Sequence, residues 1–304
     1  MTYSIVAHDP ATGQLAVGSQ SHFFGVGRLV GWGESGVGVA ATQAFVNVDH
    51  GPHGVERMRA GEEPKAALEA LLTADELAAY RQVAFCDAQG RVAAHTGSSC
   101  APAAGHLLGD GVAVQGNMLA SNRVYEDMLD AYTSAPGDLA ERVLAAMQAA
   151  EAAGGDVRGS QSAVLRVYSG NRSATPWNEV LIDIRVDDHA DPVGELARLL
   201  PRHRAFDLVG GVIFAPGLTI GPYEGVTDEL LSEKLHGLAN AADLLGADNR
   251  EPDFWRAVLL ARSGRTEEAR ALFADLFAYR PGLRQFLAGI GPLGFLSNVE
   301  EYVR

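Results

Sequence analysis

Short apolar runs and longer stretches with helical spacing follow one another through the first two-thirds of the chain. The short runs are apolar at nearly every position, which is typical of strands that are buried on both faces. Turn-forming residues at 9–13 and at 88–90 each separate two runs, so each pair of runs is predicted to form a hairpin. The predicted strands cover residues 3–8, 14–20, 36–44, 83–87, 91–96, 111–115, 162–168 and 179–186.

Apolar residues at spacings of three and four predict helices over residues 54–80, 122–133, 138–153 and 192–206. In the third helix, Asp138 and Glu141 have the spacing of a capping box. The order of strand pairs and helix pairs indicates an α+β protein, in which two packed antiparallel sheets are covered by helices on both outer faces as a four-layer αββα sandwich. A single mixed sheet is the alternative.

A domain boundary is predicted after residue 206. Residues 207–225 are rich in Gly and Pro and are predicted to connect the first domain, residues 1–206, to a second domain over residues 226–304. Thr227 is the expected cap of the first helix of that second domain. We therefore expect a small all-helical domain at the C-terminal end.

The composition narrows the class of protein. The 304 residues are 47% hydrophobic and 20% charged, which is typical of a globular protein. A formal net charge of −14 repels phosphate backbones, so nucleic acid is not expected as a partner. No stretch approaches the ~20 apolar residues that span a bilayer and no export signal is recognised, so we expect a cytoplasmic protein without membrane contact. Cys86 and Cys100 lack metal-ligand spacing and are expected to be reduced thiols.

The candidate chemistry begins at Thr2, which follows the initiator methionine and leads directly into a predicted strand. If Met1 is removed, Thr2 carries a nucleophilic hydroxyl and an α-amino group whose pKa is near ~8, so one residue supplies both nucleophile and base. The strand would hold this terminus rigidly in a sheet. Many proteins begin with Met-Thr without catalytic meaning, so the interpretation depends on polar residues further along the chain.

Polar residues stand at the ends of several predicted strands, where side chains converge on one site. Gln115 and Asn117 flank a glycine turn after a buried strand and are candidates for contacts to an oxyanion or a substrate amine. The alternative is a turn in which Asn117 bonds its own backbone.

A second polar stretch, GGDVRGSQS, joins a predicted helix to a strand. Arg158 in this stretch is a candidate for pairing with a substrate carboxylate, and Asp156 for orienting Arg158 or the Thr2 amine. The alternative is an Arg–Asp pair that fixes the loop. His95 and Gln43 are candidates for positioning these groups, although a lone histidine at the end of an apolar strand is more often structural.

The run Asp187-Asp188-His189 offers ligands suited to a metal ion. Adjacent residues of a strand point to opposite faces, however, so helix capping and salt bridges are the favoured roles. There is no Walker loop, no Rossmann fingerprint, no HExxH and no GxSxG motif. We therefore expect neither a bound metal nor a cofactor.

Taken in order, these segments resemble a bacterial family of uncharacterised proteins, domain of unknown function 1028, that is placed within the N-terminal-nucleophile hydrolase fold. The resemblance covers residues 1 to about 206. It implies the αββα sandwich and places Thr2 at the nucleophile position of that superfamily. The segments that carry it are TYSIVAHDPATGQLAVGSQS, GVGVAATQAF, GRVAAHTGSSC, AVQGNML, GGDVRGSQSA and IDIRVDDHADP.

Residues 252–294 resemble a small helical domain that is attached to members of this family and is labelled as peptidoglycan-binding. Without an export signal the chain would not meet mature cell wall, so a lid or a dimerisation element is an equal alternative. A homodimer is the expected oligomer.

The leading hypothesis is a hydrolase of C–N amide bonds in a small, carboxylate-bearing metabolite, with Thr2 as the nucleophile. Two alternatives come from other classes. One is a non-catalytic ligand-binding protein whose helical tail binds a partner, and the other is a metal-assisted hydrolase that uses Asp187, Asp188 or His189.

Overall fold

Residues 2–304 are described by the computed structural model, which divides the chain into two units, one ending at Arg198 and the other beginning at Leu199. Met1, whose removal would free the amine of Thr2, lies outside the described residues. The boundary predicted at residue 206 falls within the second unit.

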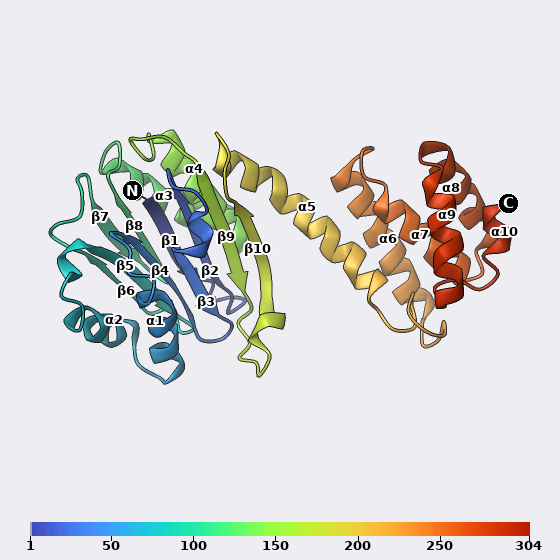
Figure 1. Cartoon of the computed structure of the whole chain (residues 1–304). Coiled ribbons are helices and arrows are strands. Elements are labelled where there is room, and N and C mark those ends of the chain that lie inside the picture. The colour runs from blue at the N-terminus through green and yellow to red at the C-terminus, as the bar shows by residue number, and fades with distance from the viewer. Residues whose placement is uncertain (1) are drawn as a thin grey trace. The chain divides into compact units, whose positions relative to one another are not determined.

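Two antiparallel sheets form the first unit (Figure 1). The order of strands is β10-β9-β2-β1-β8-β7 in the larger sheet and β3-β4-β5-β6 in the smaller one, and all of the pairs are antiparallel. Both predicted hairpins, β1–β2 and β5–β6, are confirmed. The bounds are β1 Thr2–His8, β2 Leu15–Ser21, β3 Gly31–Glu34, β4 Gly38–Ala44, β5 Arg81–Asp87, β6 Val92–Thr96, β7 Gly105–Gly109, β8 Val112–Asn117, β9 Ser162–Tyr168 and β10 Val180–Val186.

The two sheets pack face to face, so the prediction of two antiparallel sheets is confirmed and the single mixed sheet is wrong. Val6 and Val17 of the larger sheet share a buried apolar cluster with Val39 and Ala84 of the smaller sheet. Strands in this position have one face against the other sheet and one against helices, which explains why their sequences are almost continuously apolar.

Helices cover the outer face of each sheet (Figure 1). On the smaller sheet, α1 His50–Arg59 and α2 Pro64–Thr73 pack through residues such as Val55 and Leu68. On the larger sheet lie α3 Arg123–Ser134 and α4 Leu139–Ala152. A Cβ at Gly18 of β2 would lie only 2.7 Å from Val143 of α4, so this glycine allows the helix to approach the sheet closely.

The structure corrects the predicted elements of this unit. The single helix predicted over 54–80 is two helices, because Gly61 has a φ of +98° and Pro64 takes the first turn of the second helix. Two short edge strands, β3 and β7, were not predicted, and β7 has only two leucines between glycines.

The capping box at the start of α4 is confirmed. Glu141 N donates to Asp138 Oδ1 at 3.0 Å, and Asp138 N donates to Glu141 Oε2 at 3.0 Å. Asp138→Ala is expected to lower the free energy of unfolding by about 1 kcal/mol, because it removes the side-chain acceptor of an N–H in the first turn of the helix. Urea unfolding would measure this. Asp138→Asn, which keeps the acceptor, should lose much less, and equal losses in both variants would contradict the role of the cap.

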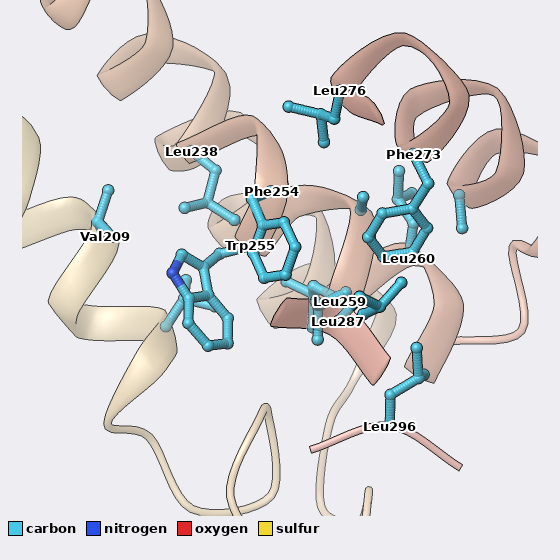
Figure 2. Close-up of a cluster of buried hydrophobic side chains, with 14 of the residues drawn as sticks. Val209, Leu238, Phe254, Trp255, Leu259, Leu260, Phe273, Leu276, Leu287 and Leu296 are labelled. Atoms are coloured by element: carbon cyan, nitrogen blue, oxygen red, sulfur yellow. The ribbon is translucent and has the colours of Figure 1, made fainter. Parts of the chain in front are cut away.

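The second unit is helical and has a core of its own. Figure 2 shows Leu238, Phe254, Trp255 and Phe273 gathered in this core, and each of them is buried. Thr227 caps α6 by accepting from Leu230 N at 3.2 Å, as predicted. The helices are α5 Pro192–Ile213, whose residues divide between the two units, α6 Asp228–Leu245, α7 Glu251–Arg262, α8 Thr266–Tyr279, α9 Gly282–Ile290 and α10 Glu300–Val303.

Helix α5 continues through the first seven residues of the predicted connector, residues 207–213. Gly210 and Gly211 each cost a helix about 1 kcal/mol relative to Ala. Burial of Val209 and Val212, both 1% exposed in the helical core, offsets that cost. Within residues 2–304, no helix is long and apolar enough to cross a membrane.

Candidate functional site

Thr2 is the first residue of β1, in the interior of the larger sheet. Across the sheet, Thr2 is paired with Asn117 of β8. The next residue, Tyr3, is paired with Gln20 of β2 on the other side. Only 6% of Thr2 is exposed. Its hydroxyl Oγ1 donates to Ser21 Oγ at 3.0 Å, at the end of β2. The hydroxyl is thereby fixed at a point where the chain enters the sheet.

A pocket of about 100 Å³ lies beside this hydroxyl. Its polar lining residues are Thr2, Ser21 and Gln43, which come from three different strands. The remaining described lining residues are apolar and are Phe23, Val26, Leu29, Val30, Ala44 and Val46. The pocket is therefore mostly apolar, with a polar group of residues around the Thr2 hydroxyl.

Gln82 of β5 is the centre of a buried amide network next to Thr2. Its Nε2 lies 2.8 Å from the carbonyl oxygen of Gly116 and 3.0 Å from that of Gly105, both of which can only accept. These two contacts fix the orientation of the Gln82 amide, so Gln82 Oε1 is the acceptor for the amides of Gln43 and Asn117. Gln43 Nε2 donates to it at 2.7 Å and Asn117 Nδ2 at 2.9 Å.

The same two amide nitrogens also contact the carbonyl oxygen of Thr2. Gln43 Nε2 donates to it at 3.1 Å, and Asn117 Nδ2 is 3.5 Å away. An amide nitrogen carries two protons, so both protons of each residue are directed to Gln82 and Thr2. Gln43 and Asn117 therefore hold the backbone of Thr2 in place.

The predicted oxyanion or substrate-amine contacts of Asn117 and Gln115 stay predictions. In this structure, the amide nitrogen of Asn117 is directed to Thr2 and Gln82. Gln115 lies two residues deeper in β8, and its Nε2 donates to Ser4 Oγ at 3.1 Å and to Ala41 O at 3.2 Å. Gln115 thus links the two sheets and is not among the described residues that line the pocket.

Asp156 and Arg158 lie close to this end of the larger sheet. The buried carboxylate of Asp156 accepts from His22 N at 3.2 Å, directly after Ser21, and residue 156 forms a bridge with Leu119, just beyond Asn117. Arg158 bonds the same carboxylate through Nε at 3.3 Å and Nη2 at 3.1 Å. The Arg158–Asp156 pair therefore fixes the loop beside the candidate site.

His95 is not part of the site. His95 is paired across the sheet with Val83, whose side chain packs toward α1 and α2. The adjacent residue, Gln82, faces the other sheet, so His95 and Gln82 lie on opposite faces. His95 Nε2 is 3.0 Å from the carbonyl oxygen of Ala78. His95 therefore lies on the face of its strand away from Thr2, because one step along a strand reverses the face.

The loop after β4, which includes the lining residue Val46, is braced by an ion pair. Arg81 donates to the carbonyl oxygen of Phe45 at 2.5 Å and to the half-buried carboxylate of Asp75 at 2.8 Å. His50 also contacts Asp75, at 3.2 Å. Hydrogen bonding from Arg81, supported by Leu77 N and Asn47, holds the pKa of Asp75 well below its usual range.

Asp75→Asn is therefore expected to lower the free energy of unfolding at pH 7 by about 2 kcal/mol. Because the folded pKa of Asp75 is depressed, its contribution is present above the unfolded pKa of about 3.9 and is lost as the pH falls through the folded pKa. The difference between wild type and variant should thus shrink below about pH 4. Urea unfolding from pH 8 to 3 measures it. The exposed pair Asp127–Arg123 gives the control, since Asp127→Asn should cost about 0.5 kcal/mol or less.

The family model of DUF1028, a family of unknown function, matches residues 2–196. The chain belongs to the DUF1028 family. Among solved structures, the crystal structure of protein SPO2555 from Silicibacter pomeroyi, which carries the DUF1028 family model, is 32% identical in sequence with a TM-score of 0.59. The alignment covers 65% of this chain and 87% of that chain. The comparison with curated proteins gave no match.

The DUF1028 match begins at Thr2 and includes every candidate residue of the site. It ends within α5, so the helical unit that follows lies outside it. The predicted binding of peptidoglycan fragments by this unit, its alternative roles as a lid or dimerisation element, the homodimer and the cytoplasmic location all stay predictions.

Two residues of the candidate site were not among the predicted candidates. Ser21 occurs in a polar cluster at the end of a predicted strand, and this position was a usable signal. Gln82 directly precedes the apolar run VAFC, and a buried amide at that position needs partners.

The residues considered for a metal do not converge in the DUF1028 unit. Asp188 accepts from Gln161 at 3.0 Å, and His189 Nδ1 is 3.0 Å from Asp191 N. Across residues 2–304, no group of three or more His, Cys, Asp or Glu side chains is arranged to hold a metal ion.

Proposed function

We propose that this DUF1028 protein hydrolyses a C–N amide bond in a small metabolite, with Thr2 as an N-terminal nucleophile after removal of Met1. The proposal includes assignment of the first unit to the four-layer αββα fold of N-terminal-nucleophile hydrolases. The observation that carries it is the Thr2 hydroxyl, which lies at the start of an interior strand and lines a small pocket.

The proposed reaction uses one residue for two tasks. Thr2 Oγ1 attacks the carbonyl carbon of the amide, and the α-amine of Thr2 takes the hydroxyl proton. The C–N bond breaks, and the amine leaves with that proton, so an ester between Thr2 and the acyl group remains. Water then attacks the ester with the same amine as base, which releases the carboxylic acid and restores Thr2.

The amide network supports this reaction by positioning. Gln43 and Asn117 contact the Thr2 carbonyl, and Gln82 holds both of their amides. A nucleophile held in one geometry avoids part of the entropic cost of reaching the transition state. Arg158, whose side chain is 37% exposed, is proposed to contact a carboxylate of the substrate at the edge of the site.

The test compares two proteins that differ only in whether the Thr2 amine is free. Proteolytic removal of a fusion partner can leave either Thr2 or Met1 as the first residue. The form with free Thr2 is expected to release glycine from a set of short N-acylglycines and to gain the mass of β-butyrolactone by ring opening at the hydroxyl. The form that retains Met1 should do neither, because an acylated nitrogen is no base. Equal reaction in both forms, or reaction in neither, would overturn the proposal.

A further inference from the structure

The pocket beside Thr2 limits the size of the group that it can hold. Its volume of about 100 Å³ is smaller than the ~150 Å³ of an apolar protein cavity that accepts benzene. Val26 and Val30 are almost fully buried and form fixed parts of the wall, whereas Phe23 is 51% exposed. A chain of a few carbon atoms fits this space, and a long chain does not.

The lining also limits the charge of that group. None of the described lining residues is ionisable as Asp, Glu, Lys, Arg or His. Arg158 is not among them, and its guanidinium is bonded to Asp156. Moving a carboxylate from water into an apolar pocket without a cation is strongly unfavourable, whereas an aliphatic group gains from the same transfer.

One of the lining residues, Gln43, carries a buried acceptor without a donor among residues 2–304. Gln43 is 1% exposed, and its Oε1 receives no hydrogen bond from residues 2–304. Buried acceptors normally have a donor, supplied by protein, water or ligand. The N–H of a substrate amide lies directly beside the acyl group and is a suitable donor.

We propose that the acyl group of the substrate is a short, uncharged aliphatic chain that occupies this pocket. Any carboxylate of the substrate then lies on the amine side, where Arg158 can meet it. The inference rests on the proposed function for the assignment of the pocket to the acyl side. It narrows the proposed substrate class from carboxylate-bearing amides in general to amino acids whose nitrogen carries a short aliphatic acyl group.

Two probes with the same amine portion test the charge preference. N-isobutyrylglycine and N-succinylglycine share the glycine portion, and their short acyl groups end in methyl groups and in a carboxylate, respectively. Binding is measured by ligand-observed NMR on the full-length Thr2→Ala protein, so turnover does not interfere. N-isobutyrylglycine is expected to bind at least about tenfold more tightly. Equal or tighter binding of N-succinylglycine, or no binding of N-isobutyrylglycine, would overturn the inference.

A pair of variants in one loop tests the location. Val46 lines the pocket and Val48, two residues further along, does not, and both are partly buried. Val46→Phe fills the pocket and should weaken binding of N-isobutyrylglycine by about tenfold or more, whereas Val48→Phe should change it by less than about twofold. Circular dichroism confirms that each variant is folded. The same affinity in wild type and Val46→Phe would place the ligand elsewhere.

Failure of this inference and failure of the proposed function give different results. Selective binding without hydrolysis by the free-Thr2 form contradicts the nucleophile but leaves the pocket assignment intact. Hydrolysis that prefers N-succinylglycine supports the nucleophile and contradicts the uncharged acyl pocket.

Discussion

Replacing Thr2 with Ala is expected to abolish amide hydrolysis while the fold remains intact. The change removes the only side-chain atom proposed to form a bond to the substrate, and loss of a covalent nucleophile typically lowers kcat by about 10⁴-fold or more. The fold loses the hydrogen bond from Thr2 to Ser21, which contributes about 1 kcal/mol. Steady-state release of glycine from N-isobutyrylglycine and urea unfolding measure the two effects.

Thr2→Ser is the matched variant for this experiment. It keeps the hydroxyl and the amine and removes only a methyl group, so turnover and labelling by β-butyrolactone should both persist. If Thr2→Ala retains wild-type turnover, or if the lactone still attaches to the Ala variant at the wild-type rate, the nucleophile is another group. Ser21 is then the first residue to examine, because its hydroxyl lies 3.0 Å from that of Thr2.

Local signals in the sequence predicted most of the first unit. The capping box at Asp138 and Glu141 needs only residues that are three apart, and the hairpin turns at 9–13 and 88–90 need only their own residues. Each of these features forms from neighbouring residues, so its sequence pattern is sufficient. The continuation of α5 through Gly210 and Gly211 could not be predicted this way, because it depends on the core that buries Val209 and Val212.

The candidate site depends on pairing between distant strands, which the sequence does not encode locally. Thr2 is opposite Asn117 in one sheet, and Gln43 is opposite Gln82 in the other. Only the packing of the two sheets brings these four residues together. His95 shows that a shift of one residue along a strand decides whether a side chain reaches the site. Thr96 is opposite Gln82 and contacts it, whereas the preceding residue, His95, is opposite Val83 and faces the helices.

The structure also shows what several of the candidate residues contact. Gln43 and Asn117 lie near Thr2, and their amide nitrogens donate to its carbonyl. Arg158 and Asp156 were expected at the substrate, and they form a pair beside the site. Residue type and approximate position could be predicted, whereas the direction of each hydrogen bond required the surrounding acceptors.

Gln82→Leu is expected to have the largest effect on stability of any single substitution at the site. Leucine has a similar size but offers neither donor nor acceptor, so the carbonyls of Gly105 and Gly116 and the amides of Gln43 and Asn117 all lose a partner. Each buried polar group left without a partner costs about 1–3 kcal/mol, and partial relaxation makes a total loss of about 3–5 kcal/mol reasonable. Urea unfolding at pH 7 measures this loss.

Gln82→Leu should also lower kcat, by about 100-fold, when turnover is measured at a temperature where the variant is folded. The reason is geometric: Gln82 orients the two amides that contact the Thr2 carbonyl, and a shift of the nucleophile by about 1 Å has an effect of this size. Gln148→Leu makes the same chemical change on the exposed face of α4 and should alter neither property. If Gln82→Leu destabilises the fold but leaves kcat unchanged, the network does not position Thr2. Gln82 would then only hold the two sheets together, because it lies in the smaller sheet and donates to carbonyls of β7 and β8 in the larger one.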